Sequence, residues 1–319
     1  MSTLLSVITI NYNGLDDTCA LISTIPHDDD TEIIVVDNAS QADEATEIER
    51  RHPGVVVVRS TENLGFAGGN NLGLQASHGK YIFFLNNDTE VPDGHWANVQ
   101  QLLSRMEADP AIAVVCPKIR FYWDSHPIQF AGFTPLSPVT LRNRSIGFGE
   151  DDHGQYDTPH PTPYAHGAAM LVRRDAIDAV GQMPECYFLY YEELDWSMMF
   201  RRAGYAIWYD PCMTILHKES RTTGQHSPLK TYYITRNRML FTRRNTALCQ
   251  RLLTYCYLIF IVGLRDIIKH TFSHSPQLRR STVQGITDFI RRRYGQKSFE
   301  RKEQFVLSKD ACHKPHKTL

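Results

Sequence analysis

The first ninety residues alternate short apolar runs with stretches long enough for a helix. The apolar runs are rich in Val and Ile and end in polar residues, which is typical of strands buried on both faces. We predict strands at residues 6–12, 32–38, 55–60 and 81–87, and helices at residues 42–51 and 68–77. This alternation predicts an α/β fold, with a mostly parallel sheet that carries helices on both faces.

The pattern changes after residue 111, where the links become longer and irregular. Strand-like runs follow at residues 111–121, 129–133, 166–174, 205–211 and 214–220. They predict a mixed edge to the same sheet. The link 134–163 is rich in Pro, Asp and Gly, and we expect it to form a loop over the site.

Charge divides the chain near residue 226. Residues 1–225 hold 15 Lys or Arg against 30 Asp or Glu, whereas residues 226–319 hold 19 against 5. We therefore predict an α/β domain over 1–225 and a basic helical region over 226–319. The apolar run 252–264 is shorter than the roughly 20 residues of a spanning helix. An anionic membrane surface is one partner for such a region, and packing on the core is the alternative.

The remaining composition is that of an ordinary α/β protein, at 42% hydrophobic and 22% charged residues. The seven cysteines are scattered and form no CxxC pair, so neither a zinc site nor a disulfide framework is indicated. The apolar start of the chain lacks the basic segment of a signal peptide. We expect a cytoplasmic protein, peripheral at the inner face of the cell membrane, with no nucleic-acid partner.

Polar side chains lie at the carboxyl ends of three of the predicted strands, the sheet edge where ligands bind in open α/β folds. They are Asn11 and Tyr12, then Asp37 and Asn38, then Asn86, Asn87 and Asp88. Asp37 could accept hydrogen bonds from a nucleobase or a ribose, although an Asx turn or a helix cap would also explain it.

The stretch 63–73 is rich in Gly and Asn and precedes a predicted helix. Asn63, Gly68 and Asn71 belong to it. Its backbone N–H groups could contact phosphate, although it matches neither GxxxxGK[ST] nor GxGxxG. Glycines that serve a tight loop are the alternative.

Asp88, with two amides before it, suits a hard divalent cation such as Mg²⁺ or Mn²⁺, which keeps waters and recruits phosphate oxygens. His217 could complete that site, or it could be an ordinary packed histidine. Glu192, Glu193 and Asp195 begin a predicted helix at 192–204, where the helix dipole stabilises carboxylates. A catalytic function needs one of these acids to accept a proton from a substrate hydroxyl.

Taken in order, these motifs resemble the inverting glycosyltransferases of family 2, which have the GT-A fold. The resemblance covers residues 5 to about 245 and is carried by VITINYNG, EIIVVDNAS, NLGFAGGNNLGL, YIFFLNNDTEVP, HGAAMLVRR and FLYYEELDWSMMFRRAGY. ILHKES and YYITRNRMLF are similar to a branch of rhamnosyl- and related transferases that build bacterial surface polysaccharides.

The resemblance implies a role for each candidate residue. Asn11, Tyr12 and Asp37 would bind the nucleobase and ribose. Asn86-Asn87-Asp88 takes the place of the family's DxD motif, so that Asp88 would bind a metal at the diphosphate with help from His217. Two departures stand out: Asn86 replaces the first acid of that motif, and Glu193 replaces the usual Asp of the catalytic pair that Glu192 begins.

The implied reaction moves rhamnose or a similar hexose from a dTDP- or UDP-sugar to a hydroxyl of a glycan or lipid-linked saccharide. A sugar-1-phosphate nucleotidyltransferase is a rival, but its N-terminal loop needs Arg or Lys, whereas NYNGLDD here is acidic. A non-catalytic protein that binds sugar nucleotides is the other rival, and Asn86 favours it slightly.

Overall fold

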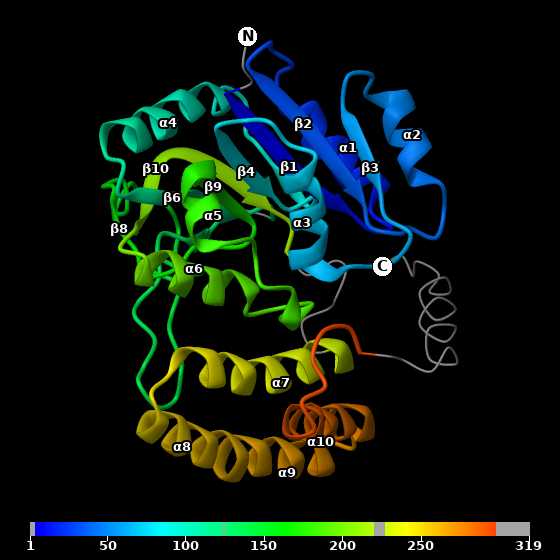
Figure 1. Cartoon of the computed structure of the whole chain (residues 1–319), viewed down its shortest axis with the longest axis vertical. Helices are drawn as coiled ribbons and strands as arrows, with labels where there is room; N and C mark the ends of the chain where they lie inside the picture. The colour runs from blue at the N-terminus through cyan, green and yellow to red at the C-terminus, as the bar shows by residue number, and fades with distance from the viewer. Residues whose placement is uncertain (1–3, 124, 220–226, 298–319) are drawn as a thin grey trace, which may run out of the picture.

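One mixed sheet lies at the centre of the molecule, and helices surround it (Figure 1). The computed structural model describes residues 4–123, 125–219 and 227–297. The strands are β1 (Leu5–Asn11), β2 (Thr31–Asp37), β3 (Val56–Arg59), β4 (Tyr81–Leu85), β5 (Thr89–Glu90), β6 (Ile112–Phe121), β7 (Ile128–Phe130), β8 (His160–Pro161), β9 (Ala169–Arg173) and β10 (Ala206–His217). Their order is β3-β2-β1-β4-β9-β6-β10-β5, with β7 on β6 and β8 on β10.

The N-terminal half of the sheet is parallel, as the Val- and Ile-rich runs predict. β1 pairs in parallel with β2 and β4, and β2 with β3, so that the strands end at one edge. Asn11 and Asp37 are register partners at that edge. β9 then runs antiparallel between β4 and β6, which makes the sheet mixed and confirms the predicted change of pattern.

The two strand-like runs predicted at 205–211 and 214–220 are joined in one strand, β10, which ends at His217; residue 220 lies outside the described residues. β10 pairs in parallel with β6 along its length, with a register shift between Asp210 and Thr214. Such a bulge leaves extra residues unpaired and bends the strand without ending it. The bulge, with Pro211 inside it, interrupts the apolar alternation that sequence analysis relies on.

The helices of the α/β part are α1 (Leu15–Ser23), α2 (Glu44–Arg51), α3 (Gly65–Gln75), α4 (Val99–Ala108), α5 (Arg174–Val180) and α6 (Glu192–Arg202), with short 3₁₀ turns η1 (Trp96–Asn98) and η2 (Glu185–Tyr187). α3 begins three residues before the predicted 68–77, at Gly65, whose φ of 72° suits glycine.

The C-terminal region is helical, as expected, over the residues described there. It contains α7 (Pro228–Asn245), α8 (Leu248–Cys256), the π-helix η3 (Tyr257–Gly263), α9 (Leu264–Phe272) and α10 (Pro276–Ile290). α7 lies between the α/β part and the other helices, and α8 and α9 lie farthest from the sheet (Figure 1). Among the described residues, no helix is both long and apolar enough to cross a membrane. The expected boundary at 225/226 and the end of the basic tail, 298–319, lie outside the described residues.

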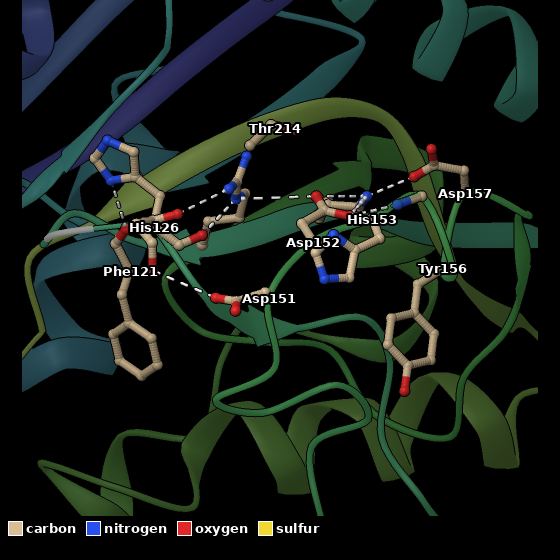
Figure 2. Close-up of polar contacts among 12 residues, drawn as sticks. Phe121, His126, Asp151, Asp152, His153, Tyr156, Asp157 and Thr214 are labelled. Carbon is tan, nitrogen blue, oxygen red and sulfur yellow. Dashed lines mark hydrogen bonds and ion pairs between the residues drawn. The ribbon is translucent and has the colours of Figure 1, made fainter.

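The link 134–163 is held to the rest of the protein on two sides. Its first half reaches the helical region, where Arg238 donates to the carbonyl oxygen of Thr140. In its second half, Asp152 and Asp157 both accept hydrogen bonds from the buried ammonium of Lys118 on β6. Figure 2 shows the contacts of Asp152 and Asp157, and Asp151 beside the turn after β6, where it accepts from the hydroxyl of Ser125. The link thus joins the sheet to the helical region.

Candidate active site

Asn11 and Asp37 form a buried polar network where β1 and β2 end. The amide nitrogen of Asn11 donates to Oδ1 of Asp37 at 3.0 Å and to Oε2 of Glu44 at 2.8 Å. Its amide oxygen accepts from the hydroxyl of Thr18 at 2.8 Å. Ser40 also donates to Oδ1 of Asp37, at 2.6 Å. Asn11 is thus engaged within the protein, and its contribution is to hold the carboxylate of Asp37 in place.

An open cavity of about 340 Å³ lies beside that carboxylate. Residues of the β2–α2 loop and of the end of β3 line it: Asp37, Ala39, Ser40, Gln41, Ala42, Asp43, Ala45, Arg59, Ser60 and Thr61. The guanidinium of Arg59 is bound to Glu49, at 2.7 and 2.8 Å, so Asp37 is the charged group that can make a charge-assisted hydrogen bond to a polar ligand here. Tyr12, half-buried, follows β1 at the same edge of the sheet.

Asn38 and Asn63 shape the chain that leads into α3. Oδ1 of Asn38 accepts from the N–H of Leu64 at 2.9 Å, and its amide nitrogen lies 3.2 Å from Oδ1 of Asn63. Asn63 in turn accepts from the N–H of Gly65 at 2.8 Å. A Cβ at Gly65 would lie 2.3 Å from the carbonyl oxygen of Phe188, so only glycine fits. The glycine-rich stretch therefore serves a tight turn at this point.

Two further residues of that stretch are also occupied by packing. The amide of Asn71 is buried and bonds to the backbone of Met183 in both directions, at 2.9 and 3.1 Å, and to Glu185 at 2.8 Å. At Gly68, a Cβ would lie 2.8 Å from Cβ of Leu64. Asn71 thus fixes α3 against the turn η2, and Gly68 permits close packing within the helix's first turns.

Asp88 and His217 meet where β4 ends and β10 ends. Oδ1 of Asp88 lies 3.2 Å from Nε2 of His217, which is buried. On the other side of the imidazole, Nδ1 lies 2.8 Å from Oε1 of Gln129. The amide nitrogen of Gln129 donates to Glu219 at 3.0 Å, which fixes the orientation of the amide. The sequence prediction that joined Asp88 to His217 thus has a spatial counterpart.

This arrangement leaves two acceptors face to face. Because Oε1 of Gln129 can only accept, the proton of neutral His217 resides on Nδ1, and Nε2 presents a lone pair to the carboxylate of Asp88. Either a second proton or a cation must lie between them. A carboxylate and an imidazole nitrogen are both ligands of divalent metals, so the residues fit one. Among the described residues, no group of three or more His, Cys, Asp or Glu could hold a metal, so further ligands would come from substrate and water.

Asn86 and Asn87 form the turn after β4. The N–H of Asn86 donates to the carbonyl oxygen of Ala168 at 2.9 Å, and its own carbonyl accepts from the N–H of Thr89 at 3.1 Å. The amide of Asn87 donates to the hydroxyl of Thr18 at 3.1 Å. The turn thereby presents Asp88 to His217 and ties it to the network around Asn11.

His166 lies beside this pair and was missed as a site residue in the sequence analysis. Its ring centroid is 6.3 Å from that of His217, and it stacks on Phe133 at 5.9 Å. Burial, with His217 nearby, lowers the pKa of His166 to about 3, so it is neutral at physiological pH. The only signal in the sequence is its place in HGAAM, at the start of the run that becomes β9.

Glu192 and Glu193 begin α6 and differ in environment. Glu192 is 3% exposed, and its Oε2 has no hydrogen-bond partner in the part of the chain described. Glu193 is half-buried and lies beside Gly167. A Cβ added to that glycine would be 3.7 Å from Cγ of Glu193. Burial raises the pKa of Glu193 above its ordinary value. Burial, together with the nearby charge of Glu193, raises the pKa of Glu192 well above its ordinary value. Burial therefore outweighs the helix dipole, which alone would lower both values.

Asp195, the third acid of the cluster, bonds to residues at the end of α7. It is fully buried, and it forms an ion pair with Arg244 and accepts from the amide of Asn245 at 2.6 Å. Arg202 also bonds to Asn245, whose amide oxygen accepts from the guanidinium at 2.7 Å. Both oxygens of Asp195 thus join α6 to the end of α7, which favours a structural role over proton transfer.

Comparisons with known proteins agree with this geometry. The family described as Glycosyl transferase family 2 matches residues 6–181. A low-salt glycan biosynthesis hexosyltransferase of Haloferax volcanii is 27% identical over 243 residues, which is 74% of each chain. An N-acetylglucosaminyl-diphospho-decaprenol L-rhamnosyltransferase of Mycobacterium tuberculosis is 35% identical over only 65 residues, 20% of this chain and 21% of that protein.

Among solved structures, a mannosyltransferase of Pyrobaculum calidifontis in complex with GDP-Man and Mn²⁺ has a TM-score of 0.52 at 14% identity, over 98% of this chain and 80% of that one. GalNAc-T7 with UDP, GalNAc and Mn²⁺ has a TM-score of 0.57 at 14% identity, over 86% and 58%. These two show the fold, which is GT-A as predicted. The sheet, the site at its carboxyl edge and the family match lead to one conclusion: the chain belongs to glycosyltransferase family 2 and is a glycosyltransferase.

Proposed function

We propose that this enzyme transfers rhamnose or a similar hexose from a dTDP- or UDP-sugar to a hydroxyl of a glycan or lipid-linked saccharide, with inversion at the anomeric carbon. The observation that carries the proposal is the Asp88–His217 pair, a carboxylate oxygen and an imidazole nitrogen held 3.2 Å apart at the carboxyl edge of the sheet. The names of the hexosyltransferase and rhamnosyltransferase relatives support the choice of donor sugar.

The nucleoside would occupy the cavity beside Asp37. Its carboxylate, fixed by Asn11 and Ser40, can accept hydrogen bonds from a base imide or a ribose hydroxyl. Tyr12 would flank the base from the end of β1. The turn at Asn63 lies next to this cavity through its bond to Asn38.

Asp88 and His217 would hold Mg²⁺ or Mn²⁺, together with diphosphate oxygens and water. When bound, the cation neutralises the negative charge that grows on the departing nucleoside diphosphate. The Mn²⁺ in the two solved structures of the same fold supports a divalent ion. With Asn86 in place of an acid, His217 is the second protein ligand on which binding depends.

Glu193 would be the general base. The acceptor hydroxyl loses its proton to this carboxylate as its oxygen bonds to the anomeric carbon, while the bond from that carbon to the diphosphate oxygen breaks on the opposite face. The raised pKa of Glu193 makes it a stronger base than an exposed glutamate. Glu192, which is more deeply buried, would stay protonated over a wider pH range.

We also propose that residues 226–319 form a separate functional region that binds the membrane surface beside the 1–225 catalytic part. The continuous helix 248–272 exposes a row of large apolar side chains: Leu248, Leu252, Leu253, Phe260, Ile261, Leu264, Ile268 and Phe272. Most of these side chains recur every four residues, which is slightly more than the 3.6 residues of one α-helical turn. The π-helix η3 has more residues per turn, so it offsets part of the resulting drift around the helix and keeps the row closer to one face.

Basic side chains border this apolar row, as expected for a helix that lies on anionic lipid. Arg265 and Lys269 are exposed between its members, and Arg279 and Arg280 are exposed on α10. A lipid-linked acceptor would be encountered at the inner face of the membrane. Replacing Phe260 and Leu264 by Asp should abolish flotation of the protein with anionic vesicles at low salt. Flotation equal to that of the native protein would contradict the assignment.

A thermal-shift screen of nucleotide sugars with Mn²⁺ or Mg²⁺ tests the proposed donor. A ligand that binds only the native state raises the midpoint of unfolding in proportion to the logarithm of its concentration. We expect a shift with dTDP- or UDP-sugars that needs the metal and is lost in Asp88→Asn. A shift with nucleoside triphosphates in preference to sugar nucleotides would contradict the proposal.

A further inference from the structure

The segment between η2 and α6 holds a backbone conformation that its own side chains disfavour. Phe188 has φ 71° and ψ −56°, Tyr190 has φ 68°, and Tyr191 has φ 81°. Positive φ is rare for bulky residues, because Cβ then crowds the neighbouring carbonyl. Such conformations persist only where the surroundings fix them, and they gather at functional sites. Contacts from outside the segment must therefore hold it.

Four consecutive carbonyl groups of the segment accept hydrogen bonds from other elements. The N–H of Phe66, at the start of α3, donates to the carbonyl oxygen of Phe188 at 2.8 Å. The amide nitrogen of Asn237 on α7 lies 3.0, 2.6 and 2.9 Å from the carbonyl oxygens of Tyr187, Leu189 and Tyr190 respectively. One fully buried side chain thus holds three of the four carbonyls.

Arg236 orients that side chain. Its Nε donates to the amide oxygen of Asn237 at 2.9 Å, so the NH₂ group must face the carbonyls. A second guanidinium nitrogen donates to the carbonyl oxygen of Tyr187 at 2.7 Å. The guanidinium is 4.9 Å from the ring centroid of Tyr233 and 5.4 Å from that of Tyr232, and the residue is 1% exposed. A buried, multiply bonded arginine of this kind leaves Asn237 little freedom.

We propose that Asn237, oriented by Arg236, is a positioning residue for Glu193. The left-handed Tyr191 is the N-cap of α6, so its backbone sets the direction in which the first turn of that helix begins. Glu193 lies in that turn. By holding residues 187–191, Asn237 fixes where the base points, and through Phe66 the same segment stays in register with α3 beside the donor site. The inference rests on the proposed function, in which Glu193 is the base.

A double-mutant cycle tests the link between the two residues. Asn237→Ala should lower kcat about 10²-fold, the effect of a displacement of about 1 Å at a reacting group. Nucleotide and Mn²⁺ binding should remain, because Asn237 bonds to Arg236 and to the carbonyls of residues 187–190 and to none of the residues proposed to bind donor or metal. In a Glu193→Gln background, measured under single-turnover conditions, the same substitution should cost less than about threefold, because residues that act as a unit are not additive.

Asn98→Ala is the matched control. It also removes an amide that donates to a backbone carbonyl, that of Cys212 at 2.7 Å, but it lies away from residues 187–191. It should lower the midpoint of unfolding with little change in kcat. If Asn237→Ala does not fold, Arg236→Lys replaces it in the cycle, since it loses the bond that orients the amide.

Two results would overturn the inference: a kcat of Asn237→Ala within about threefold of the native value, or an equal loss in both backgrounds, which would indicate a purely structural role. A native rate for Glu193→Gln is a different failure. It would overturn the assignment of the base in the proposed function, and it would be seen in the single variant before the cycle is closed.

Discussion

Gln129→Met tests how far the proposed metal site depends on groups that would not touch the metal. The substitution keeps the volume of the side chain but removes the oxygen that accepts the Nδ1 proton of His217 at 2.8 Å. Without that acceptor, neither the tautomer nor the ring orientation of His217 is fixed. Glu219 loses its hydrogen bond from the same amide. We expect weaker Mn²⁺ binding at Asp88 and His217.

The expected magnitude follows from the buried hydrogen bond. Such a bond contributes about 1–1.5 kcal/mol net, and 1.4 kcal/mol corresponds to about a tenfold change in a dissociation constant. Loss of an outer partner of a metal-bound histidine typically costs about 10- to 100-fold in metal affinity. We therefore expect the Mn²⁺ dissociation constant of Gln129→Met to rise at least tenfold.

The assay is a titration of Mn²⁺ without nucleotide, followed by the electron paramagnetic resonance signal of the free ion. It reports binding independently of turnover. Gln155→Met, on an exposed loop, is the control and should retain the native affinity. An unchanged affinity in Gln129→Met, where His217→Ala has lost binding, would refute the reasoning.

Three further predictions concern the acids of the site. Asp88→Asn should abolish or severely lower turnover and leave the midpoint of thermal unfolding nearly unchanged, and activity that survives excess EDTA would contradict a metal requirement. Glu193→Gln should lower kcat by about 10²-fold or more while donor binding survives. In the native enzyme, kcat should fall as pH drops through the raised pKa of Glu193, because the proposed base must be ionised. Burial also raises the pKa of Glu192 in the folded state, so its contribution to stability is full below about 4.5, the ordinary value, and is lost as pH rises through the folded value. Glu192→Gln should therefore raise the unfolding midpoint at pH 8 more than at pH 5, and an equal shift at both would show that Glu192 is not buried as a proton-binding group.

The sequence predicts the parallel half of the fold well, because Val- and Ile-rich runs such as those of β2 and β4 are buried on both faces. It predicts β10 less well, because the bulge after Asp210 breaks the pattern inside one strand. Both are local sequence signals, so an interruption of the pattern affects the prediction of that strand alone.

The residues of the candidate site also divide into those that a sequence motif predicts and those that depend on partners distant in the sequence. The resemblance to family 2 brings Asp88 and His217 together, but a glutamine within an apolar run gives no sign that it orients an imidazole, so Gln129 was missed. The roles of Asn11, Asn71 and Asp195 depend on partners such as Glu44, Met183 and Arg244, which no spacing rule connects to them. Successive residues of an α-helix point about 100° apart, which agrees with the different burial of Glu192 and Glu193.

The stacking of the C-terminal helices sets a minimum distance between the first turn of α6 and any membrane surface on which the outer helix rests. α8 and α9 lie farthest from the sheet, α7 packs on α8 and α10, and α6 packs on α7 (Figure 1). Packed helices have axes about 8–10 Å apart, so two such steps hold the first turn of α6 roughly 20 Å above the outer helix. If that helix rests on lipid, a hydroxyl within the headgroup layer cannot reach the base. The enzyme would then select acceptors by length, and would accept only saccharides whose acceptor hydroxyl already lies some 20 Å from the bilayer.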